Sequence, residues 1–188
     1  MTINSLINQA HKAAVKKGFY KDDRNIGELL MLIVSELGEA LEAHRCGRMC
    51  NDDIQVFLSD RKKNGFSILA YEGYIQGTFE EEIADAFIRL FDLCGYLEIK
   101  IKTYPKLEML CFKNIGQELL WWTATLANLP SFIEYYKEND ITKEIQEISL
   151  LVKRMEIFCK SYNIDIKKHI KAKMEYNETR PEKHGKEY

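Results

Sequence analysis

Two stretches of the chain, NIGELLMLIVSELGEAL at residues 25–41 and FEEEIADAFIRLFDLCG at residues 79–95, decide the fold. In each stretch apolar residues recur at intervals of three and four, the spacing that places them on one side of an α-helix. Asp23 or Asn25 can cap the first helix, and Thr78 can cap the second. The sequence therefore predicts an all-α protein, a helical bundle in which these two amphipathic helices pack antiparallel.

Similar apolar spacing predicts further helices along most of the chain. The full set expected is 3–18, 25–45, 79–100, 107–128, 131–138, 141–161 and 165–177. The segment 46–78 lacks this spacing and is rich in glycine, so it is predicted to be a long loop. Such a loop is either a functional lid or a disordered spacer, and its IQVFL and FSILAY runs are weak strand signals.

The helix beginning near residue 25 has a second, weaker copy. Asn25-Ile26-Gly27 aligns with Asn114-Ile115-Gly116, and the similarity continues to residue 129 without the acids of the first copy. We interpret residues 102–163 as a helical insertion or a degenerate second repeat inside one domain covering residues 1–188. The chain would then be a monomer with the form of a pseudo-dimer, although a homodimer, or chance similarity between two amphipathic helices, stays open.

Composition restricts the class of protein. Hydrophobic residues make up 46% and charged residues 30% of the chain, and the net charge of −2 gives no general attraction to nucleic acid or anionic membranes. The five cysteines form no CxxC pair, which favours reduced core thiols in a cytoplasmic protein. No signal-peptide core is present, and no run approaches the roughly 18 apolar residues of a membrane span.

Each of the two deciding helices carries a pair of acids beside its apolar face. Glu36 and Glu39 lie on the first helix, and Glu82 and Asp85 take the same place on the second. Four carboxylates brought together need a cation, and hard oxygen ligands favour Mg²⁺, with Mn²⁺ as a substitute. The alternative is that these acids are simply solvated. Solvation is what we expect of Glu28, Glu42, Glu80 and Glu81.

These motifs resemble the MazG-like branch of the all-α NTP pyrophosphatases. The signature of that superfamily is ExxE, a spacer and ExxD, which here reads Glu36-Leu-Gly-Glu39 and Glu82-Ile-Ala-Asp85. The ending KHIKAKMEYNETRPEKHGKEY is also similar to that of MazG-like proteins, so the resemblance covers about residues 1–101 and 164–188. It implies Mg²⁺-dependent hydrolysis of a nucleoside triphosphate, an NTP or a dNTP, to the monophosphate and pyrophosphate.

The resemblance also implies roles for individual residues. The four acids would hold the metal, and Glu36 or Glu39 would orient the attacking water. We predict that the substrate is bound by Arg89, Lys173, Asn177, Arg180 and His184. His11 and Phe19–Tyr20 either line a base pocket or simply pack in the interior, whereas His44 and Trp121–Trp122 are expected to pack. Rival functions are a non-catalytic nucleotide- or metal-binding regulator and a structural helical adaptor.

Overall fold

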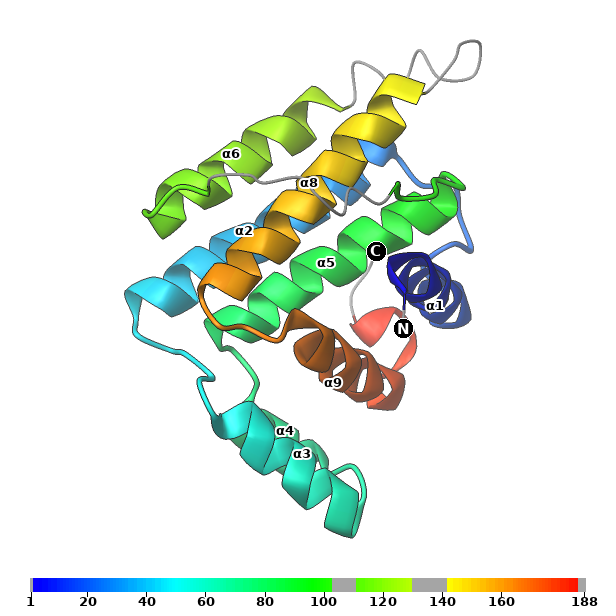
Figure 1. Cartoon of the computed structure of the whole chain (residues 1–188). Coiled ribbons are helices and arrows are strands. Elements are labelled where there is room, and N and C mark those ends of the chain that lie inside the picture. The colour runs from blue at the N-terminus through cyan, green and yellow to red at the C-terminus, as the bar shows by residue number, and fades with distance from the viewer. Residues whose placement is uncertain (1, 103–110, 130–141, 186–188) are drawn as a thin grey trace.

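The computed structural model describes residues 2–102, 111–129 and 142–185, and within these ranges it contains helices and no strand (Figure 1). The all-α helical bundle expected from the sequence is therefore confirmed. The α-helices, in chain order, are α1 (Ile3–Lys16), α2 (Ile26–Arg45), α3 (Asp53–Asn64), α4 (Ile68–Tyr74), α5 (Phe79–Tyr96), α6 (Ile115–Asn128), α8 (Thr142–Ser161) and α9 (Ile166–Thr179). None of these described helices combines the length and apolar character needed to cross a membrane.

The helix α5 is the centre of the molecule. It packs against α1, α2 and α9, which surround it in Figure 1. Twelve of its eighteen residues are buried, so the buried surface extends well beyond the single apolar stripe that its sequence shows. The side chain of Thr78 caps its first turn by accepting a hydrogen bond from the backbone N–H of Glu81. The first turn of α5, with its three consecutive glutamates, consequently lies inside the protein.

Gly95 allows α1 to approach α5 closely. A Cβ atom at this position would lie 2.4 Å from the Cβ of His11, which is closer than two such atoms can come. The same approach lets His11 Nδ1 lie 2.8 Å from a carboxylate oxygen of Asp92. The α1–α5 contact thus forms one wall of the cavity described below.

The second helical pair packs on the first. Helix α6 lies along α2, and Phe158 of α8 contacts both Phe79 of α5 and Trp122 of α6. Both α2 and α6 begin with an asparagine cap, Asn25 and Asn114, whose side chain accepts from the amide three residues on. This shared start agrees with the proposed repeat, which stays a prediction. The helix expected at 131–138, and residues 107–110, lie outside the described residues.

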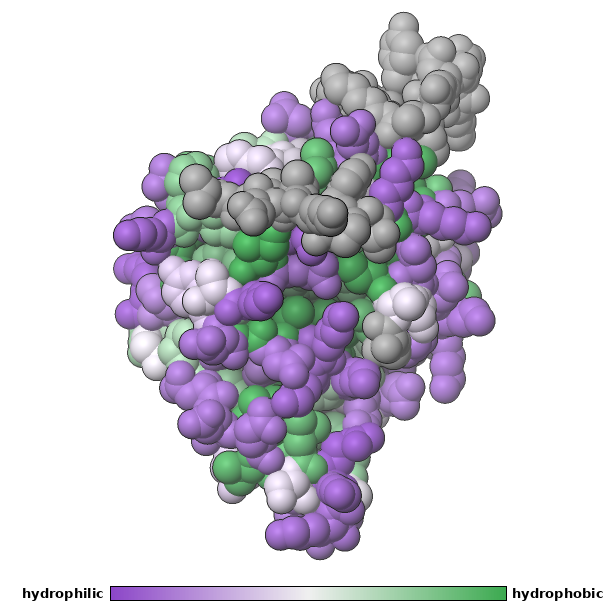
Figure 2. All heavy atoms as spheres, in the orientation of Figure 1, coloured by the Kyte–Doolittle hydropathy of each residue, from purple (hydrophilic) through white to green (hydrophobic). Residues whose placement is uncertain are grey.

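The prediction of a long loop over 46–78 is wrong, as are the strand signals within it. This segment contains α3 and α4, which form a helical hairpin at the bottom of Figure 1. The hairpin has its own apolar cluster, made of Cys50, Ile54, Phe57, Tyr71, Ile75, Ala172 and Tyr176. Two of these residues belong to α9, so the hairpin is stabilised by tertiary packing that its weak helical periodicity did not indicate. Hydrophobic residues also reach the surface at this end of the molecule (Figure 2).

A buried ion pair joins α6 to α8. Glu118 is fully buried and accepts two hydrogen bonds from the guanidinium group of Arg154, at 2.6 and 2.7 Å. It also accepts from the indole N–H of Trp122 and the backbone N–H of Phe112. Every oxygen of this carboxylate is therefore paired, as burial of a charge requires.

We expect Arg154→Met to lower the free energy of unfolding by about 3–5 kcal/mol, because it leaves the Glu118 carboxylate buried without its counter-ion. Urea unfolding monitored by circular dichroism measures this loss. The matched control is Arg45→Met, since Arg45 forms an exposed pair with Glu42 that should contribute less than about 1 kcal/mol. Equal effects of the two substitutions would contradict the assignment of Arg154 as the essential partner of a buried charge.

Candidate functional site

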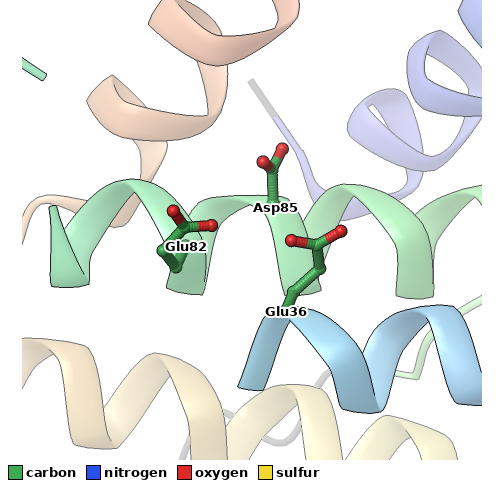
Figure 3. A group of neighbouring side chains, drawn as sticks. All are labelled: Glu36, Glu82 and Asp85. Atoms are coloured by element: carbon green, nitrogen blue, oxygen red, sulfur yellow. The ribbon is translucent and has the colours of Figure 1, made fainter. Parts of the chain in front are cut away.

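Three of the four predicted metal ligands meet between α2 and α5. Glu82 and Asp85 lie one turn apart on α5, and Glu36 reaches toward them from α2 (Figure 3). Each residue offers one carboxylate oxygen, and these three oxygens lie within 4.8 Å of one another. Glu36 and Glu82 are buried and Asp85 is partly exposed, so the group has one open side.

Glu39 does not join this group. Its side chain is exposed on α2, one turn beyond Glu36, and contributes no oxygen to the cluster. Residues three apart on a helix are neighbours on its surface, so Glu39 lies next to Glu36 on α2. The sequence motif ExxE therefore divides into one buried acid and one acid that faces solvent.

The chain supplies its own cations to the acid cluster. The guanidinium group of Arg89 forms an ion pair with Glu36, and the ammonium group of Lys173 lies 2.6 Å from a carboxylate oxygen of Asp85. Lys173 is buried, although it was predicted to bind substrate from the C-terminal segment. Close acids cannot all stay ionised unless positive charge lies beside them, and these two residues provide that charge.

Two neighbouring acids that we expected to be solvated are buried. Glu80 accepts hydrogen bonds from the backbone N–H groups of Cys50 and Asn51, and so fixes the chain ahead of α3. Glu81 accepts from the backbone N–H of Gly77 and the hydroxyl of Tyr71, and pairs with Lys173. Thr78 and Glu81 have the spacing of a capping box, which was the available signal that Glu81 turns back toward the start of its helix.

Burial raises the pKa of two acids in the cluster, Glu82 and Asp85. It raises the pKa of Glu82 to about 8, with the charges of Glu81 and Asp85 adding to this effect and that of Lys173 opposing it. Burial also raises the pKa of Asp85, against the lowering effect of Lys173. A bound cation would reverse this balance by favouring the ionised carboxylates.

A cavity of about 330 Å³ opens beside Asp85, between α1, α5 and α9. Four of the five predicted substrate-binding residues line it: Arg89, Asn177, Arg180 and His184. The side-chain carbonyl oxygen of Asn177 is buried there without a hydrogen-bond partner. Phe19 and Tyr20 also line the cavity, and His11 packs edge-on against Tyr20. The fifth predicted residue, Lys173, is instead committed to the acids.

His184 contributes no positive charge to this cavity. Burial lowers its pKa to about 3, and the nearby charges of Arg180 and Lys17 act in the same direction. Its ring packs edge-on against Phe19 at a centroid distance of 5.2 Å. His184 is therefore a neutral wall residue near pH 7. The ring of His44 contacts that of Phe79 at a centroid distance of 5.7 Å, but the residue as a whole is exposed, so the expected packing is only partial.

No protein-family model, curated protein sequence or solved structure matches the chain. Any proposal about its function therefore has to rest on the residues of the site.

The raised pKa of Glu82 predicts a pH-dependent loss of stability in the metal-free protein. An ordinary glutamate ionises near pH 4.5, so the unfolded chain releases this proton before the folded protein does. The free energy of unfolding should therefore fall as the pH rises from about 4.5 to about 8. In Glu82→Gln this contribution is absent, so the variant should gain stability relative to the wild type across that range.

Urea titrations in chelator at several pH values measure this difference. Glu39→Gln is the matched control, because it removes an exposed carboxylate from the neighbouring helix. Parallel stability curves for the wild type and Glu82→Gln would show that burial does not hold a proton on Glu82.

Proposed function

We propose that this chain is a Mg²⁺-dependent nucleoside triphosphate pyrophosphohydrolase of the MazG-like kind. One observation carries the proposal: the carboxylates of Glu36, Glu82 and Asp85 converge, and Asp85 also lines a cavity that arginine side chains line as well. Adjacent negative and positive groups of this kind suit a metal-bound triphosphate, which needs a cation on one side and donors on the other.

The donor set fits Mg²⁺ or Mn²⁺. The cluster offers only carboxylate oxygens, and Mg²⁺ is commonly held by few carboxylates while its remaining positions go to water and phosphate oxygens. The partly exposed Asp85 also lines the cavity, so a ligand there can reach the open side of the cluster. When bound, the cation would neutralise negative charge on the phosphate oxygens and favour attack on phosphorus.

Arg180 is the best candidate for holding the outgoing pyrophosphate. Among the other cations that line the cavity, Lys17 donates to the backbone carbonyls of Glu178 and Arg180, and Arg24 pairs with Glu28. The guanidinium group of Arg180 has one long hydrogen bond of 3.4 Å to the backbone carbonyl of His184. Its planar fork is suited to two phosphate oxygens at once.

Glu39 is the candidate for orienting the attacking water. Glu36 is buried and paired with Arg89, whereas Glu39, one turn further along α2, is exposed. An exposed carboxylate can accept a proton from water and pass it to solvent. We assign Glu36 to the metal and Glu39 to the water, with attack at the α-phosphorus and no covalent intermediate.

Purified protein should release pyrophosphate and a nucleoside monophosphate from at least one nucleotide when Mg²⁺ is present. A panel of canonical and damaged NTPs and dNTPs, with product analysis by chromatography, tests this. Asp85→Asn should lower kcat at least about a hundredfold, the scale of losing a principal electrostatic group. Asp52→Asn, which alters an exposed carboxylate that makes no capping hydrogen bond, is the control.

Absence of turnover on the whole panel would refute the proposal. Binding of nucleotide without turnover would favour the regulator, and absence of Mg²⁺ and Mn²⁺ binding in calorimetry would favour the structural adaptor.

Arg180→Met should raise KM for the nucleotide at least about tenfold, because a charge-assisted bidentate contact to phosphate is lost. Steady-state kinetics measure this change, and Lys168→Met is the control because Lys168 pairs with Asp165 on the outer surface of α9. An unchanged KM and kcat would remove Arg180 from the substrate site.

A further inference from the structure

The ammonium group of Lys173 lies beside the acid cluster. It contacts carboxylates of Asp85 and Glu81, and the side chain is 8% exposed. Asp85 also belongs to the group of three oxygens that could hold a cation. The carboxylate of Asp85 therefore pairs with Lys173 and is also a potential metal ligand. The ammonium group and a metal ion would compete for it.

The two partners of Lys173 differ in how they are held. Glu81 is 1% exposed and is fixed by the hydroxyl of Tyr71 at 3.0 Å and the backbone N–H of Gly77 at 2.6 Å. It does not belong to the group of three. Asp85, by contrast, borders the cavity. If Asp85 turns toward a cation, Glu81 is still in place to keep Lys173 charged and beside the site.

We propose that Lys173 is a displaceable internal counter-ion of the acid cluster, and that Glu81 is the positioning residue that retains its ammonium group when Asp85 turns to a metal ion. This inference rests on the proposed metal site. Lys173 neutralises the acids in the metal-free protein, and once released from Asp85 it has a free N–H to direct at a phosphate oxygen. One side chain thus joins metal binding to substrate binding.

The α3–α4 hairpin supports this arrangement from outside. The ring of Tyr71 in α4 stacks on Tyr176 of α9 with a centroid separation of 4.4 Å and an angle of 8°. Arg61 of α3 forms a double hydrogen bond with Glu175, also on α9. The hairpin therefore packs against α9, the helix that carries Lys173. The hydroxyl of Tyr71 in the hairpin also donates a hydrogen bond to Glu81, the buried partner of Lys173.

Isothermal calorimetry with Mg²⁺ alone, without nucleotide, tests the competition. Lys173→Met should tighten Mg²⁺ binding at least about tenfold, because a positive charge that competes for Asp85 is removed. Should this variant fail to fold, Lys173→Gln keeps hydrogen-bond donors for both carboxylates and should tighten binding in the same direction. Both variants should lose kcat, since no ammonium group remains for the phosphate.

A double-mutant cycle separates two effects of Glu81 on Mg²⁺ binding: its positioning of Lys173 and the direct effect of its negative charge. Glu81→Gln should weaken Mg²⁺ binding about tenfold in the wild type, because Lys173 is then left with Asp85 as its only carboxylate partner. In the Lys173→Met background the same substitution should have a much smaller effect. Equal effects in both backgrounds would show that Glu81 acts only through its charge, and would overturn its positioning role.

Tyr71→Phe keeps the stacked ring but removes the hydroxyl that holds Glu81, so it should weaken Mg²⁺ binding in the same direction by a smaller factor. Tyr162→Phe is the control, since its hydroxyl donates to a distant backbone carbonyl at Lys113. If the wild type binds Mg²⁺ and Lys173→Met binds it no more tightly, the counter-ion proposal fails alone. If the wild type binds no Mg²⁺, the proposed metal site fails together with it.

Discussion

Burial of carboxylates along α5 is the constraint on which the rest of the structure depends. A charge removed from water must be paired or protonated, and each acid of this helix meets the requirement differently. Glu80 is held by backbone N–H groups, Glu81 by a hydroxyl, an amide and an ammonium group, and Asp85 by the same ammonium group. Glu82 has a raised pKa. The groups that pair with these acids come from α4, α9 and the chain before α3, so these segments lie next to α5.

The two helical pairs use a glutamate and an arginine in different ways. In the first pair, buried Glu36 of α2 pairs with Arg89 of α5, and Arg89 also lines the cavity. In the second pair, Glu118 of α6 and Arg154 of α8 are closed off, with the glutamate fully saturated by hydrogen bonds. A saturated, buried pair can stabilise packing but offers nothing to a substrate. This contrast is the physical reason for proposing that the first pair carries the chemistry and the second has a supporting role.

The cavity depends on contacts between the two ends of the described chain. The side chain of Lys17, just after α1, donates to the backbone carbonyls of Glu178 and Arg180, and the backbone N–H of Lys183 donates to the carbonyl of Lys17. These bonds bring Arg180 and His184 against the cavity that Asp85 borders. The C-terminal segment therefore forms one wall of the cavity, because hydrogen bonds to Lys17 hold its main chain at both Arg180 and Lys183.

The sequence by itself determined most of the helices, the Asn25 and Thr78 caps, and the position of Glu36, Glu82 and Asp85 beside the apolar faces of α2 and α5, because these follow from local spacing. Tertiary structure decided the rest. Helical periodicity identifies a single apolar face, whereas α5 is packed against three helices. Glu80 and Glu81 are therefore buried, and Lys173 is buried beside the acids. The α3–α4 hairpin escaped prediction because its stability comes from an apolar cluster shared with α9. Glu39 remained outside the cluster for the converse reason, since its side chain is exposed on α2 and the carboxylate stays in water.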